Sequence, residues 1–235
     1  MYKKITHSIQ EEHFDHPMVL PKNISNLSAS KINMDINTPL PNFVMTESTM
    51  LFRMDSRTLW SKYIWGLINY GISMNNNIPG TDQVQARLVK NANALGEYIV
   101  PYYGVATGTR FANLLTSFST IGAQVVDAVK DKRTIEGIPE LWAQIIDNIA
   151  TFLNDLNPDN WPKDVVTDYF NNIVRYWVQE ITTRAAMDWT NNEIAIDGLS
   201  KIAITGLGHS GSTFGSLADF FSRGIIAQFP LKFTA

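Results

Sequence analysis

Apolar residues recur every three to four positions from about residue 51 to the C-terminus, which is the period of an amphipathic helix. Short turns rich in asparagine, glycine and proline separate the periodic segments, so neighbouring helices are expected to run antiparallel. The pattern therefore predicts an all-α protein, an antiparallel up-down helical bundle with a four-helix core plus one or two extra helices. The expected helices cover 55–74, a segment that Thr81 or Asp82 caps and Pro101 breaks, 105–131, 139–155, 163–190 and 212–228.

The first 50 residues show no sustained period of either kind. They contain four prolines among many asparagines and serines, a composition typical of an arm or linker. We therefore divide the chain into an extended N-terminal arm, 1–50, and a helical-bundle domain, 51–235. An ordered arm must pack on its own bundle or on a neighbouring subunit, which favours a homo-oligomer or an assembly partner bound through the arm.

Composition narrows the possible functions. The chain of 235 residues is 45% hydrophobic, which is enough for a sizeable core, and it has no cysteine for disulfides, thiolate metal sites or a catalytic thiol. Its 19 basic and 22 acidic residues form no dense basic run, so no nucleic-acid partner is expected. Because Lys3 and Lys4 precede polar residues rather than an apolar core, and no stretch is apolar enough for a membrane span, we expect a cytoplasmic protein without a recognisable secretion signal.

Two catalytic motifs are suggested near the C-terminus and then disfavoured. The sequence 206–211 matches G-x-G-x-x-G after a possible strand at 201–205, but no second strand and no acidic residue about 20 positions on complete a dinucleotide site. The same stretch resembles a nucleophile elbow, yet Ser212 stands where a glycine is required and no histidine follows. We interpret it as a kink between helical segments, and we expect no catalytic residue and no cofactor.

Glu180 lies on the apolar face of its predicted helix, between Trp177 and Arg184. A buried carboxylate must be paired or hydrogen-bonded, and an arginine one turn later is well placed for this. A structural ion pair is the favoured interpretation, and a working polar site inside the bundle is the alternative. The cluster from Glu11 to His16 also has metal-capable side chains, but in an irregular arm these indicate adventitious binding.

Several short stretches between residues 51 and 233 stand in a distinctive order: Phe52-Arg53-Met54, Leu59-Trp60, Arg87-Leu88, Gly96, Pro101-Tyr102-Tyr103-Gly104, Gly108, Phe152-Leu153, Asn157-Pro158, Asn160-Trp161-Pro162, Asp188-Trp189, Gly224-Ile225-Ile226, Gln228-Phe229-Pro230 and Lys232-Phe233. Together they resemble a family of uncharacterised single-domain helical-bundle proteins of soil bacteria, with relatives in large DNA viruses. The resemblance implies a four-helix-bundle core and no established activity.

The resemblance also implies a difference inside the bundle. In the bacterial pattern, inward histidines and carboxylates occupy positions that could build a bundle metal site. The matching positions here are Tyr63, Ala94 and Ser117-Phe118, so the resemblance implies that any metal site has been lost. What remains is a residual polar site consisting of Asp147, Glu180 and His209.

Three functions follow as hypotheses. The first is a non-enzymatic structural or interaction protein, such as a virion or assembly component, that makes contacts through its bundle and its arm. The second is a bundle with a residual metal or small-ligand site inside the helices. The third is a small-molecule binder that uses Tyr102, Tyr103 and Trp161.

Overall fold

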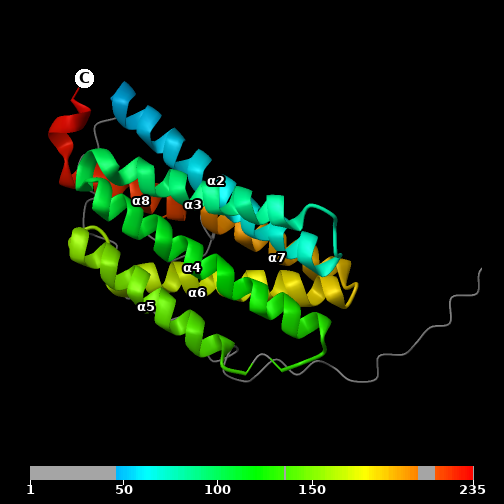
Figure 1. The fold of residues 1–235 in the computed structure, drawn as a ribbon. Helices are drawn as coiled ribbons and strands as arrows, with labels where there is room; N and C mark the ends of the chain where they lie inside the picture. The colour runs from blue at the N-terminus through cyan, green and yellow to red at the C-terminus, as the bar shows by residue number, and fades with distance from the viewer. Residues whose placement is uncertain (1–45, 135, 206–214, 235) are drawn as a thin grey trace, which may run out of the picture. The chain divides into compact units, whose positions relative to one another are not determined.

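The computed structural model describes residues 46–134, 136–205 and 215–234. These residues form helices and no strand, which confirms the all-α bundle (Figure 1). The elements are α2 (Glu47–Asn75), α3 (Thr81–Tyr103), α4 (Val105–Lys130), α5 (Ile138–Leu156), α6 (Lys163–Ala185), α7 (Trp189–Ser200), the π-helical turn η1 (Lys201–Thr205), α8 (Leu217–Gln228) and the 3₁₀ turn η2 (Pro230–Phe233).

Each helix from α2 to α7 packs against the next one along the chain, and the turns between them are short (Figure 1). Helix α2 is central, because it also contacts α4, α6, α7 and α8. Its second half is buried on most sides, and the aromatic and aliphatic residues from Tyr63 to Tyr70 supply much of the core. The up-down order places both ends of the described chain, α2 and η2, at the same end of the bundle (Figure 1).

The core is built largely from aromatic rings. Trp60 is fully buried, and edge contacts join it to Phe111, Phe170 and Phe221. Phe221 stacks in turn on Trp161, with ring centroids 4.9 Å apart and planes 6° apart. Offset and edge contacts of this kind add specific geometry to the hydrophobic burial, so they fix the helices in one arrangement.

Two buried tryptophan rings, those of Trp161 and Trp177, lie directly on the backbone of a facing helix. A Cβ atom at Gly122 would fall 2.0 Å from the Trp177 indole, and one at Gly224 would fall 2.1 Å from Trp161 Nε1. Any side chain at either position would therefore displace a fully buried tryptophan. The helical period showed that Gly122 faces the core, but it could not show which ring the glycine accommodates.

The N-terminal boundary of the bundle lies earlier than predicted. Helix α2 begins at Glu47, so the last four residues of the segment that we assigned to the arm form its first turn. Thr46 and Thr49 cap this turn reciprocally, and Thr46 Oγ1 also donates to the carbonyl of Phe233 at 2.8 Å. The contact with Phe233 is long-range, and sequence periodicity does not reveal such a contact.

The prediction of a helix break at Pro101 was wrong. Helix α3 continues to Tyr103. Pro101 lies in the last turn of the helix, where its missing N–H removes only one backbone hydrogen bond. The helix stops at Gly104, whose φ of 85° suits glycine. Its start was also mispredicted, since Gly80 rather than Thr81 or Asp82 is the N-cap residue.

The region after α6 contains more helix boundaries than expected. Helix α6 ends at Ala185, five residues before its predicted end, and Asp188 caps α7 by accepting from the amide of Asn191 at 3.2 Å. The segment 201–205, considered as a strand, is instead the π-helical continuation of α7. The glycine-rich stretch 206–211 lies outside the described residues, and α8 begins at Leu217 rather than at 212.

Replacing Gly122 with alanine tests the Trp177 contact. The alanine should gain about 1 kcal/mol of helix propensity, yet overpacking should outweigh it and lower the free energy of unfolding by about 2 kcal/mol in total. Chemical denaturation of the full chain measures this change. Lys90→Ala, at an exposed position of α3, is the control and should stay within about 0.5 kcal/mol of the wild type. A Gly122→Ala protein as stable as the wild type would contradict the contact.

Candidate functional site

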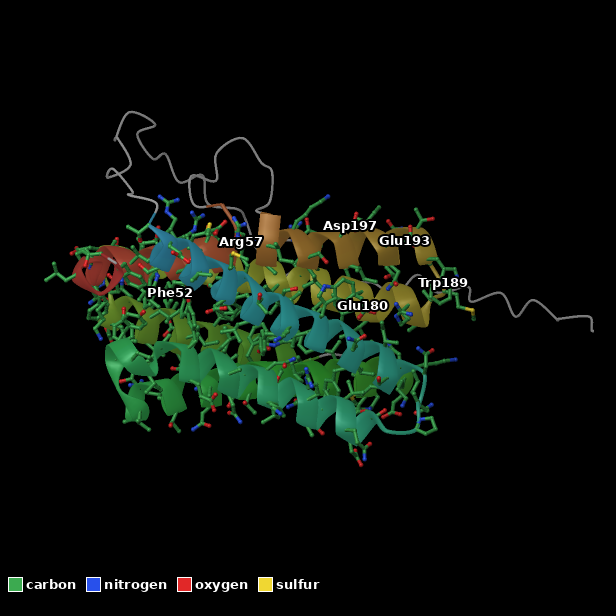
Figure 2. All side chains as sticks on the ribbon, turned by 90° about the horizontal axis from the view of Figure 1, so that it is seen from above. Phe52, Arg57, Glu180, Trp189, Glu193 and Asp197 are labelled. Atoms are coloured by element: carbon green, nitrogen blue, oxygen red, sulfur yellow. The ribbon has the colours of Figure 1, made fainter. Side chains whose placement is uncertain are left out.

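Glu180 is the candidate site that the structure develops furthest (Figure 2). It projects from α6 into the bundle, and its exposed fraction is 0%. Its Oε1 accepts a hydrogen bond from Nε of Arg184 at 2.8 Å, one helical turn later. The ion pair predicted from the sequence is therefore confirmed.

Helix α7 completes the surroundings of this pair. The second guanidinium nitrogen of Arg184 donates to Oδ1 of Asn192 at 2.9 Å, and Asn192 Nδ2 donates to the backbone carbonyl of Glu180 at 2.8 Å. Trp189 lies at the same end of α7, with the Arg184 guanidinium carbon 5.7 Å from its ring centroid. Asn192 and Trp189 were not predicted as site residues, because nothing in the sequence around Met187 indicates the turn that folds α7 back over α6.

Three polar atoms at the α2–α6 contact have no hydrogen-bond partner within the described residues: Glu180 Oε2, Trp177 Nε1 and Asn75 Oδ1. A Cβ atom at Gly71 would lie 2.9 Å from Glu180 Oε2 and 3.3 Å from Trp177 Nε1, so both atoms face the bare backbone of α2. Asn75 lies one turn further along α2 and donates to the carbonyl of Ile181 at 3.2 Å. Buried polar atoms of this kind are costly, so the contact is a polar weak point in an apolar interface.

Burial raises the pKa of Glu180, and the hydrogen bonds and charge of Arg184, together with Asn192, offset only part of this effect. Desolvation disfavours the ionised carboxylate, whereas the guanidinium favours it. The desolvation of Glu180 therefore makes this ion pair less stabilising than its short distance alone would suggest. The pair also links the packing of α6 and α7 to the protonation of one carboxyl group.

The residual site expected from the resemblance does not assemble as a cluster. Asp147 lies on the solvent face of α5, where its Oδ1 is 2.7 Å from Nζ of Lys163, and it is not in contact with Glu180. The core face of α5 is formed by residues such as Ile145 and Ile149, and the helical period leaves position 147 outside it. His209 lies outside the described residues.

The positions at which the resemblance implied polar interior groups differ in their burial. Tyr63 and Phe118 are fully buried, and the Tyr63 hydroxyl donates to the carbonyl of Leu115 at 2.8 Å. Ser117 is exposed on α4 and Ala94 is half-buried on α3, so neither points fully into the core. Phe118 stacks near Trp177, with ring centroids 6.4 Å apart, so aromatic rings fill the interior beside Glu180.

Tyr102, Tyr103 and Trp161 do come close together, but as packing. The Tyr103 ring lies 5.9 Å from that of Trp161, which has no exposed surface. Tyr102 stacks on Phe233, with centroids 5.7 Å apart and planes 8° apart. These rings hold η2 against α3, so the structure uses them to fix the C-terminal segment.

An exposed apolar surface, which the sequence analysis did not identify, runs along α2. We call it the α2 strip, and its large apolar members are 44–55% exposed: Met50, Leu51, Met54 and Trp65. Their spacing places them on one side of the helix, with Thr58 and Ser61 between them. Because apolar residues of α2 occur on all sides of the helix among polar ones, its pattern did not separate the strip from the core.

Within 46–134, 136–205 and 215–234, no group of three histidine, aspartate or glutamate side chains could hold a metal ion, and no helix is long and apolar enough to cross a bilayer. The chain matches no family model, no curated protein and no solved structure. Function must therefore be argued from the α2 strip, the Glu180 site and the remaining surface.

The raised pKa of Glu180 gives a prediction with a defined sign. Between pH 4.5, the ordinary pKa of a glutamate, and the raised pKa, the folded protein keeps a proton on Glu180 that the unfolded chain releases. The stability that the protonated Glu180 contributes is therefore fully present below pH 4.5 and is lost as the pH rises through the raised pKa. Glu180→Gln has no such proton. The free energy of unfolding of Glu180→Gln minus that of the wild type should therefore rise from pH 4.5 towards neutral pH. The rise is about 1.4 kcal/mol for each pH unit by which the folded pKa of Glu180 exceeds 4.5.

Urea unfolding of both proteins across this pH range measures the difference. Asp147→Asn, which removes an exposed carboxylate of α5, is the matched control and should follow the wild type within about 0.5 kcal/mol at every pH. A Glu180→Gln difference that does not vary with pH would mean that the folded pKa of Glu180 is not raised.

Proposed function

We propose that this chain is a non-enzymatic interaction protein, an assembly component in which residues 1–45 of one copy bind the α2 strip of a neighbouring copy. The observation that carries this proposal is the strip itself. Four large apolar side chains lie exposed on the helix that begins where the arm ends. Large apolar side chains exposed on one side of a helix are typical of a protein interaction site.

The strip offers enough apolar surface to hold an arm. Fully burying one large apolar side chain contributes about 1.5–3 kcal/mol, and exposed fractions near one half leave part of that gain available at each position. The arm carries matching apolar runs, Met18-Val19-Leu20 and Phe43-Val44-Met45.

The geometry at Thr46 favours a neighbouring copy over the same chain. Thr46 is extended, with φ −86° and ψ 163°, and its hydroxyl is bonded to the carbonyl of Phe233 at the end of the bundle. Helix α2 and its strip run away from Thr46, so an arm that continued in the direction of Thr46 would leave its own strip and meet that of a neighbouring copy. The resemblance to proteins of large DNA viruses makes a virion one setting for such an assembly.

Light scattering of three proteins tests this proposal: the full chain, the chain lacking residues 1–45, and the full chain with Leu51→Glu and Met54→Glu. The deletion and the double substitution should both reduce the full chain to the same smaller species, because each removes one side of the same contact. Ile194→Glu with Leu231→Glu changes two exposed apolar residues elsewhere and should keep the wild-type mass. A full-size assembly from either the deletion or the strip variant would overturn the proposal.

A second candidate function rests on the Glu180 site. Three buried polar atoms of α2 and α6 have no hydrogen-bond partner within the described residues, and such atoms suit a small polar ligand or ion held beside Arg184. Native mass spectrometry of the full chain tests it. A stoichiometric adduct that is present in the wild type and absent from Glu180→Gln would support this function, and an adduct-free wild type would contradict it.

A further inference from the structure

The outer face of α4 carries unusually few charges for a surface helix. No charged residue occurs from Phe111 to Val126, although this stretch presents a full exposed face. Solvent-facing sides of amphipathic helices are normally charged, whereas the centres of protein interfaces are depleted in charge. The exposed residues along the face are Arg110, Asn113, Ser117, Thr120, Gln124 and Asp127.

Two shallow grooves lie along this face. A shallow groove of about 330 Å³ separates α4 from α5 and is lined by Thr116, Thr120, Gln144 and Leu141, among others. A second groove of about 330 Å³ lies along α4 beside Asn113. Ser117 borders both grooves, so they follow one another along α4, and grooves on a helix surface are where the side chains of a second helix pack.

The order of side chains along the face is complementary to itself. Ser117 and Thr120 are the central pair of the face. Asn113 lies four residues before Ser117, and Gln124 lies four residues after Thr120. Arg110 lies seven residues before Ser117, and Asp127 lies seven residues after Thr120. A second α4 laid antiparallel across the first would therefore place Ser117 opposite Thr120, Asn113 opposite Gln124, and Arg110 opposite Asp127. Hydroxyl would meet hydroxyl, amide would meet amide, and opposite charges would meet at both ends.

Both terminal charges are available for such a contact. Within the described part of the chain, neither Arg110 nor Asp127 forms an ion pair. The Arg110 guanidinium lies over the ring of Phe152 on α5, 5.0 Å from its centroid, which holds the charge beside the face. Both residues are exposed, so each is accessible to a partner.

We infer that two copies of this chain form a twofold dimer through antiparallel contact of their α4 helices, centred between Ser117 and Thr120. A twofold contact uses the same surface on both copies, which is what the self-complementary order provides. This interface is independent of the α2 strip. Deleting the arm should leave the α4 dimer intact, so the failure of either proposal can be recognised separately.

Charge reversal at the ends of the face tests the dimer in the full chain. Arg110→Asp and Asp127→Arg each place like charges opposite one another twice per dimer, and each should weaken dimerisation by at least about tenfold. The double variant Arg110→Asp, Asp127→Arg restores opposite charges and should recover the wild-type dissociation constant. Asp197→Arg, an equal change on the exposed face of α7 (Figure 2), should have no effect. Single variants that dimerise like the wild type, or a double variant without recovery, would overturn this pairing.

A disulfide tests the register without disturbing charge, since the chain has no cysteine of its own. Asn113→Cys and Gln124→Cys are prepared as separate full chains. In the proposed dimer, each new cysteine lies about 16 Å along the helix axis from its own copy in the partner, too far for a disulfide. The two different cysteines lie opposite one another.

Mixing the two chains under mild oxidation should give a covalent dimer containing one of each, and either chain alone should stay uncrosslinked. Circular dichroism of the variants verifies that they are folded before oxidation. A mixture that does not crosslink, or a single variant that crosslinks equally well, would contradict the antiparallel register centred between Ser117 and Thr120.

Discussion

The contact between buried aromatic rings and bare helix backbone is the constraint on which this bundle depends. Trp177 lies on Gly122 and Trp161 lies on Gly224, each so close that no side chain could take the glycine's place. These contacts join α6 to α4, and the segment before α6 to α8. Because a large planar ring fits such a surface in few orientations, the rings set the spacing of the helices as well as filling the core.

This packing also explains the position of Glu180. The carboxylate lies one turn from Trp177 on α6, beneath α7, and its neighbours are rings and the backbone of Gly71. Arg184 donates to one of its oxygens, and Asn192 bonds both the Arg184 side chain and the Glu180 backbone carbonyl, which ties α7 to α6. A fully apolar residue could pack here as well, so the ion pair contributes a specific position for α7 more than it contributes stability.

With the interior filled by rings, our proposals concern the surface. The α2 strip is apolar and follows the arm, whereas the face of α4 is neutral, polar and complementary to itself. The two surfaces differ in chemistry, and this difference allows them to serve different contacts. An α4 dimer that displays two strips and two arms could bind neighbouring dimers and so extend an assembly.

The sequence by itself determined the helical content, most helix positions and the pairing of Glu180 with Arg184, because all three follow from periodicity and from contacts within one or two turns. It placed α4 and α5 to within one residue at each end. It did not determine the start of α2, where Thr46 forms a long-range contact with Phe233, the course of α3 past Pro101, or the π-helical turn after α7.

Only the tertiary structure decided which residues meet. It placed Asp147 in solvent beside Lys163, and it brought Asn192 and Trp189 from α7 over Arg184. It also showed that Met54 and Trp65 are exposed, although apolar residues occur on all sides of their helix. A single helix defines its own faces, but the partner that covers each face depends on the packing of the whole chain, and for this reason the functional surfaces emerge only from the folded protein.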